Sequence, residues 1–152
     1  MRSAKRTNPL QNIKNALLKR RKIGLIILFI IATLGYFIDQ YYPFSPPEYI
    51  SPEWRHPFVY FLIIYKIIEL GIFYLLFYKR HSIALIEAKF HLRAVEKFEK
   101  SAKRFFFLVP QGSIVFGFLS YKLSGEIMYL WLFLCISFLT LLLVNPNNLK
   151  ES

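Results

Sequence analysis

Cysteine is almost absent from this chain of 152 residues: Cys135 is the only one, and it lies in an apolar run. A single cysteine excludes a disulfide within the chain and a zinc site built from cysteines. The sequence also contains no HExxH, GxSxG, GxGxxG or Walker-loop motif, the patterns that mark common metal, nucleophile and phosphate sites. The sequence therefore favours a protein that is not an enzyme, and it predicts no catalytic residue, metal or cofactor.

Charged residues are scarce in several long stretches of the chain. Hydrophobic residues make up 55% of the sequence, and many fall into runs close to the ~20 residues needed to cross a bilayer core. The runs predict a single all-α membrane domain over residues 23–144, preceded by a basic segment, 1–22, and followed by a short tail, 145–152. Four transmembrane helices are expected, at about 23–42, 57–78, 105–121 and 127–144.

The segment between the second and third runs has a different pattern. From residue 82 to residue 104, apolar side chains recur at steps of three and four among charged ones, which predicts one long amphipathic helix. Ser82 is its expected N-cap. The apolar stripe is expected either to lie on the membrane surface or to pack on a partner helix. Its members are Leu85, Ala88, Leu92, Val95, Phe98, Ala102 and Phe105.

The formal net charge is +11, and the basic residues are unevenly placed. Residues 1–22 and 79–104 each contain eight Lys or Arg, whereas residues 39–56 and 122–126 contain one each. Basic residues concentrate in cytoplasmic loops of membrane proteins, so both termini are expected on the cytoplasmic or equivalent inner side. The basic segments are expected to bind anionic lipid, and the apolar runs make lipid a better partner than nucleic acid.

The two connections on the opposite side differ in composition. Residues 39–56 combine several prolines with Tyr, Phe and Trp, which predicts a segment folded back on the outer interface rather than a disordered linker. Pro57 suits the first turn of the second span. Residues 122–126, KLSGE, predict a tight turn that joins the third and fourth spans as a helical hairpin.

Lys66 and Glu69 lie near the middle of the second span. Their spacing of three places both side chains on similar sides of one helix. A charged side chain at the bilayer centre costs about 2.5–3.5 kcal/mol on insertion scales, so it is a functional candidate by default. The pair would line an ion or proton path or bind a headgroup. The alternative is that the two residues neutralise each other, or pair with a partner subunit, and fix helix packing.

Pro110, Gln111 and Gly112 interrupt the third span. A proline within a helical pattern kinks the helix or starts a new one. A broken membrane helix can expose carbonyl groups to an ion, so these residues are a candidate broken-helix site. The alternative is a plain kink with a hydrogen-bonded glutamine.

The charged face of residues 82–104 is interpreted either as a solvated surface or as a surface that docks an inner-side partner or lipid headgroups. His81 directly precedes this segment and His91 lies within it. The two are ten residues apart and do not match the i, i+4 spacing of a helical metal pair. We expect these two and His56 to be solvated or interfacial. The basic residues of the surface are Lys89, Arg93, Lys97, Lys100, Lys103 and Arg104.

Three functions are compatible with this sequence. The first is a non-catalytic subunit or assembly factor of a larger membrane protein complex, favoured by the small size and the absence of catalytic motifs. The alternative is a homo-oligomeric ion channel or small transporter lined by Lys66, Glu69 and Gln111. The third is a membrane enzyme or lipid-handling protein that uses Glu69, or Glu87 with His91. Expected partners are the lipid bilayer and other membrane subunits or further copies of this chain.

Overall fold

The computed structural model describes residues 9–87, 89, 91–144 and 146, and no strand occurs among them. The prediction of an all-α fold is therefore confirmed. In chain order the elements are α1 (Pro9–Tyr41), α2 (Pro52–Phe73), the π-helical segment η1 (Tyr74–Lys79), α3 (Arg80–Glu87), α4 (Leu92–Ser124) and α5 (Ile127–Leu143).

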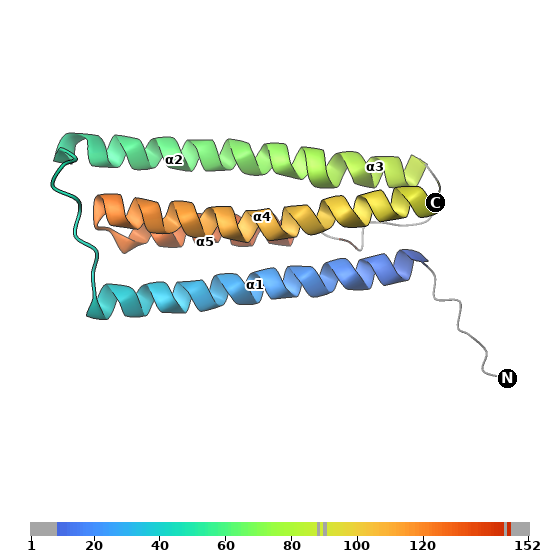
Figure 1. The fold of residues 1–152 in the computed structure, drawn as a ribbon, viewed down its shortest axis with the longest axis horizontal. Coiled ribbons are helices and arrows are strands. Elements are labelled where there is room, and N and C mark those ends of the chain that lie inside the picture. Colours follow the sequence, from blue (N-terminus) through green and yellow to red (C-terminus); the bar gives the residue numbers. More distant parts are fainter. Residues whose placement is uncertain (1–8, 88, 90, 145, 147–152) are drawn as a thin grey trace.

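α4 is the central helix of the bundle (Figure 1). It packs against α1, against α5 and against the continuous rod formed by α2, η1 and α3. The α1–α2 loop and the α4–α5 turn lie at one end of the bundle, and the junction between α3 and α4 lies at the other end. α1, α4 and the rod of α2, η1 and α3 therefore each run nearly the full length of the bundle, whereas α5 is shorter.

Three stretches of helix are long and apolar enough to cross a membrane, which suggests a membrane protein. They are Gln11–Tyr41, Pro52–Glu87 and Leu92–Ser124. α5 is apolar but shorter, with 17 residues. α1 and α4 contain 33 residues each, which corresponds to about 50 Å, against about 30 Å for a hydrocarbon core. These helices therefore extend well beyond the apolar thickness of a bilayer.

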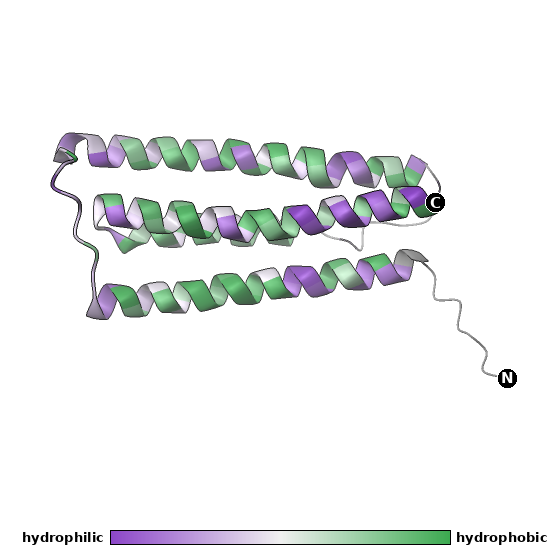
Figure 2. Ribbon diagram, viewed as in Figure 1, coloured by the Kyte–Doolittle hydropathy of each residue, from purple (hydrophilic) through white to green (hydrophobic). Residues whose placement is uncertain are grey.

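The excess length is charged (Figure 2). Hydrophilic residues gather along the first half of α1 and along α3 and the first half of α4, whereas the remaining lengths of these helices are mostly hydrophobic. We call this part the charged extension; it comprises residues 11–22, 79–87 and 91–104. The basic segment 1–22 was expected to precede the first helix, but from Pro9 onward it is the beginning of α1.

The amphipathic segment 82–104 is two helices, so the prediction of one is wrong. The rod that contains the second span continues to Glu87. Lys89 has a φ of 47°, and α4 begins after His91, which has extended backbone angles. Ser82 lies inside α3, where its hydroxyl donates to the carbonyl of Lys79 at 2.8 Å, and is not an N-cap. The chain folds back here because the two halves can then bury their apolar faces.

The apolar stripe packs on helices of the same chain and not on the membrane surface. Leu85, Phe98, Ala102 and Phe105 are fully buried, and Val95 is nearly so. They share one core cluster with residues of α1 and η1, including Ile13, Leu17 and Tyr78. Leu92 is 69% exposed, and Ala88 lies outside the described residues. The stripe thus joins the charged extension to the apolar part of the bundle as one continuous core.

α2 begins earlier than the sequence predicts. Pro52, not Pro57, stands in the first turn, after Ser51, and Pro57 lies within the helix. A proline inside a helix leaves the carbonyl four residues earlier without its donor. Here that carbonyl belongs to Glu53, at the exposed start of α2, where water can replace the missing N–H.

The α1–α2 loop is held on the bundle, as predicted for a folded-back segment. The Tyr121 hydroxyl donates to Asp39 Oδ1 at 2.6 Å and accepts the N–H of Phe44 at 3.3 Å. The Phe44 ring lies 4.8 Å from the Tyr121 ring, centroid to centroid. The Arg55 side chain donates to the carbonyls of Ile50 and Pro47 at 3.1 and 3.2 Å. One buried phenol therefore fixes both the end of α1 and the first residues of the loop.

The hydroxyl of Tyr121 is expected to stabilise the bundle by about 1–3 kcal/mol, because its removal leaves a carboxylate and an N–H without their partner. The variant Tyr121→Phe should lower the unfolding temperature in mild detergent and speed proteolysis of residues 42–51. Tyr49→Phe is the matched control, since Tyr49 is 85% exposed in the same loop. Equal protease sensitivity of the two variants would contradict this role of Tyr121.

α4 and α5 form the predicted hairpin. Gly125 ends α4 with a φ of 76°, a left-handed conformation that favours glycine, and its N–H donates to the Tyr121 carbonyl at 2.8 Å. Leu130 of α5 then packs against Gly35 and Gly117, which leave room for its side chain. A Cβ added at Gly35 would lie 2.5 Å from Leu130 Cδ2, and a Cβ added at Gly117 would lie 2.7 Å from Leu130 Cδ1. These close approaches bring α1, α4 and α5 together.

Candidate functional site

Lys66 is buried in the apolar part of the bundle. Its side chain is 0% exposed, and Nζ lies 2.8 Å from Glu69 Oε2, one turn further along α2. The same Nζ lies 5.4 Å from the centre of the Phe116 ring of α4. A carboxylate and an aromatic face thus both stabilise the ammonium group in the absence of water. Lys66 and Glu69 were predicted to lie on similar sides of one helix. In the structure they form an ion pair within that helix.

Gly112 provides the space for the lysine. A Cβ at this position would collide with Lys66 Nζ and would lie 3.9 Å from Glu69 Oε2. Nζ therefore approaches the backbone of α4 at a residue that has no side chain. The sequence presented Lys66–Glu69 and Pro110–Gly112 as two separate candidate sites. The structure brings Gln111 and Gly112 beside the ion pair, whereas Pro110 lies on the side of α4 that faces α1.

The helix is not broken at Pro110. α4 is continuous from Leu92 to Ser124, and Pro110 is buried within it. The prediction that a new helix starts here is therefore wrong, whereas a kink stays a prediction; the helical hydrogen-bond ladder loses only the N–H that proline lacks. Pro110 packs toward Gly24 of α1, where an added Cβ would lie 3.8 Å from its Cγ. Contact with neighbouring helices keeps the segment helical.

Glu69 and Gln111 line a hollow on the side of the bundle. The hollow has a volume of about 290 Å³ and lies between α2 and α4; we call it the α2–α4 hollow. The Glu69 side chain is 19% exposed, and Gln111 is an exposed residue. Apart from these two polar side chains the lining is Gly112 and apolar residues: Phe73, Leu108, Val115 and Phe116.

Neither a protein-family model, a curated protein nor a solved structure matches this chain. The function of the site is therefore argued from its geometry and its place in the bundle.

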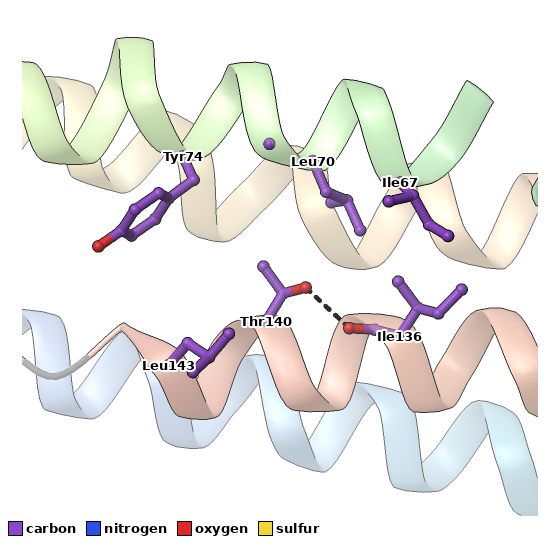
Figure 3. A pocket seen from close by; sticks show the side chains of 7 residues that line it. Ile67, Leu70, Tyr74, Ile136, Thr140 and Leu143 are labelled. Carbon is purple, nitrogen blue, oxygen red and sulfur yellow. Dashed lines mark hydrogen bonds between the residues drawn. The ribbon is translucent and has the colours of Figure 1, made fainter. Parts of the chain in front are cut away.

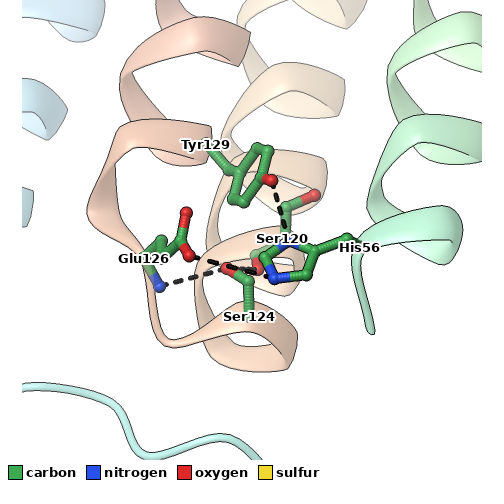
Figure 4. A network of polar contacts seen from close by, with 5 residues as sticks. All are labelled: His56, Ser120, Ser124, Glu126 and Tyr129. Carbon is green, nitrogen blue, oxygen red and sulfur yellow. Dashed lines mark hydrogen bonds and ion pairs between the residues drawn. The ribbon is translucent and has the colours of Figure 1, made fainter. Parts of the chain in front are cut away.

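A second polar cluster, which the sequence did not predict, lies at the loop end of the bundle (Figure 4). His56 Nδ1 lies 3.0 Å from the Tyr129 hydroxyl, and His56 Nε2 lies 4.0 Å from Glu126 Oε1. Ser124 Oγ donates to the carbonyl of Ser120 at 2.8 Å and accepts the N–H of Glu126 at 3.1 Å. The hydroxyl of Ser124 is thus used by the backbone, and the cluster ties α2 to the α4–α5 turn.

An apolar groove runs between α2 and α5 (Figure 3). Its volume is about 330 Å³. The hydroxyl of Thr140 donates to the carbonyl of Ile136 at 2.8 Å, inside its own helix. The groove therefore offers an almost purely apolar surface. Its lining residues are Ile67, Leu70, Gly71, Tyr74, Ile136, Thr140 and Leu143.

Five of the six basic residues proposed as a docking surface lie on the charged extension, and Lys89 lies between α3 and α4. Lys103 is partly buried and forms an ion pair with Glu99 at 2.5 Å, at the i, i+4 spacing read from the sequence. The others are exposed: Lys89, Arg93, Lys97, Lys100 and Arg104. Within the described residues no group of three or more His, Cys, Asp or Glu side chains is placed to hold a metal ion.

Proposed function

We propose that this chain is a non-catalytic subunit or assembly factor of a larger membrane protein complex, and that the α2–α4 hollow binds a transmembrane helix of the partner. The observation that carries the proposal is an exposed Gln111 amide beside a partly open Glu69 carboxylate, on a side of the bundle that is otherwise apolar. Both belong to helical stretches that are apolar enough to cross a membrane.

Lipid chains cannot satisfy these polar groups. A donor or acceptor that faces hydrocarbon without a partner costs several kcal/mol, whereas polar side chains between transmembrane helices hydrogen-bond each other and hold the helices together. A partner helix with a polar side chain at the same depth would satisfy the Gln111 amide and the open side of Glu69. The partner segment is thus expected to carry a polar or basic residue opposite this hollow.

The buried lysine argues against conduction through a single copy of the chain. Lys66 is 0% exposed and Glu69 Oε2 is already engaged by its ammonium group. An ion path needs groups that face an open, hydrated space. A homo-oligomeric channel would require several copies to meet at the α2–α4 hollow, with Glu69 facing a shared path.

The membrane placement is part of the same proposal. We place four helices across the bilayer, with α5 as the shortest at about 25 Å for its 17 residues. Both termini and the charged extension then lie on the cytoplasmic or equivalent inner side, because that side carries most of the Lys and Arg residues. The loop with the His56 cluster lies on the outer side.

Site-specific photocrosslinking in native membranes tests the proposed interface. A photoreactive amino acid at position 111 should give an adduct with a different polypeptide. The matched control is position 139 of α5, since Leu139 is 59% exposed but lies away from the hollow. An adduct of twice the mass of this chain would replace the proposal with the homo-oligomeric alternative. Equal labelling from both positions would contradict a specific interface.

A further inference from the structure

The far end of the charged extension contains a basic hollow. α3 and α4 enclose a volume of about 380 Å³, lined by His81, Ala84, His91, Arg93, Ala94 and Lys97. Four of these six residues carry basic side chains, and none is acidic. His81 and His91 are ten residues apart in the sequence, so contact of both with one hollow could not be predicted; the fold of α3 against α4 brings them to one place.

The groups that line the hollow have donors available to a ligand. Arg93 and Lys97 are exposed, lie one turn apart on α4 and form no ion pair with any described residue. His81 Nδ1 donates to the carbonyl of Leu76 at 2.9 Å, which orients the imidazole and commits its N–H to the backbone, so the donors for a ligand come from Arg93 and Lys97. The hollow also lies at the beginning of α4, where the helix dipole adds partial positive charge.

We propose that this hollow binds a phosphate-bearing small molecule. Arginine offers paired N–H donors that match phosphate oxygens, and lysine adds a compact positive charge. The volume of about 380 Å³ falls within the range of about 300–1,000 Å³ that is usual for small-molecule sites. The proposal is independent of the α2–α4 hollow, which lies in the membrane part of the bundle.

Distance from the membrane favours a soluble ligand over a lipid headgroup. The uncharged part of α4 begins at Phe105, which lies 8 residues after Lys97 and 14 residues after His91; these separations correspond to about 12 and 21 Å along the helix. The headgroup layer adds only about 5–8 Å to each side of the hydrocarbon core. The side of the hollow that His91 and Arg93 line therefore lies beyond the headgroup layer, where a soluble ligand has better access than a phospholipid that remains in the bilayer.

Pyrophosphate binding to the full-length protein in phosphatidylcholine nanodiscs tests the proposal. Titration calorimetry should detect binding that weakens as salt is raised. The double variant Arg93→Gln, Lys97→Gln should raise the Kd at least tenfold. The control Lys100→Gln, Arg104→Gln removes the same charge from the same helix, outside the hollow, and should change the Kd less than twofold.

Three results would overturn the inference. Absence of pyrophosphate binding to the wild-type protein would mean that the hollow is not a phosphate-binding site. Equal weakening in both double variants would mean a diffuse attraction to the basic helix. Loss of binding when phosphatidylglycerol replaces phosphatidylcholine, at constant ionic strength, would mean that a lipid headgroup occupies the hollow. Far-ultraviolet circular dichroism of each variant establishes that α3 and α4 remain folded.

Discussion

Replacing Glu69 with glutamine should destabilise this protein more than replacing Lys66 with methionine. Lys66 is 0% exposed, so Glu69→Gln leaves an ammonium group buried without its counter-ion. Breaking a buried ion pair from one side typically costs about 3–5 kcal/mol. Lys66→Met leaves a carboxylate at the open hollow, where it can take up a proton and become neutral, so we expect about 1–3 kcal/mol for this variant.

The double variant Lys66→Met, Glu69→Gln should recover most of the lost stability, because neither charge remains. Denaturant unfolding in mild detergent measures all three variants, and Ile67→Met is the control for an exposed position of α2, at 54% exposure. Additive losses in the double variant would contradict an ion pair between these two residues. Greater loss from Lys66→Met than from Glu69→Gln would contradict the buried position of the ammonium group.

Alanine at position 112 should be destabilising by about 1–3 kcal/mol, the usual effect of adding volume to a well-packed site. Its Cβ would collide with Lys66 Nζ, and the lysine has little freedom to move because Glu69 and Phe116 hold it. α2 and α4 would then have to separate, or the ion pair would have to break.

Gly71→Ala is the matched control, because an added Cβ at Gly71 meets nothing within 4 Å. In a helix this change is neutral or slightly favourable. The effect of Gly112→Ala should also largely disappear in the Lys66→Met background, since the obstructing ammonium group is gone. A Gly112→Ala effect that is the same in both backgrounds would contradict contact between Gly112 and Lys66.

The apolar helices and the ion pair could be predicted because their signals are local. Uncharged runs identify the apolar helices, the KLSGE segment predicts the turn at Gly125, and the spacing of three brings Lys66 to Glu69. The break after Glu87 could not be predicted, because no Gly or Pro lies between residues 82 and 104. The turn there includes Lys89 at a φ of 47°, a conformation that lysine rarely adopts.

Contacts between helices account for what the sequence analysis missed. Gly112 is important because of a lysine on another helix, 46 residues earlier. His56 was expected to be solvated or interfacial, and it is exposed; its contacts with Tyr129 and Glu126 could not be predicted, because they depend on how α2 packs beside the α4–α5 turn. The proline at position 110 suggests a break only when α4 is considered alone. In the bundle, packing toward α1 keeps the helix continuous.

The native mass and composition of the protein, extracted from its own membrane in mild detergent, test the central proposal most directly. We expect the wild-type chain to purify in a larger assembly with at least one other polypeptide. Gln111→Leu should release that polypeptide, whereas Val115→Leu, an apolar change in the same hollow, should retain it. A wild-type chain that migrates as a lone monomer, or a Gln111→Leu variant that retains every partner, would contradict the proposal.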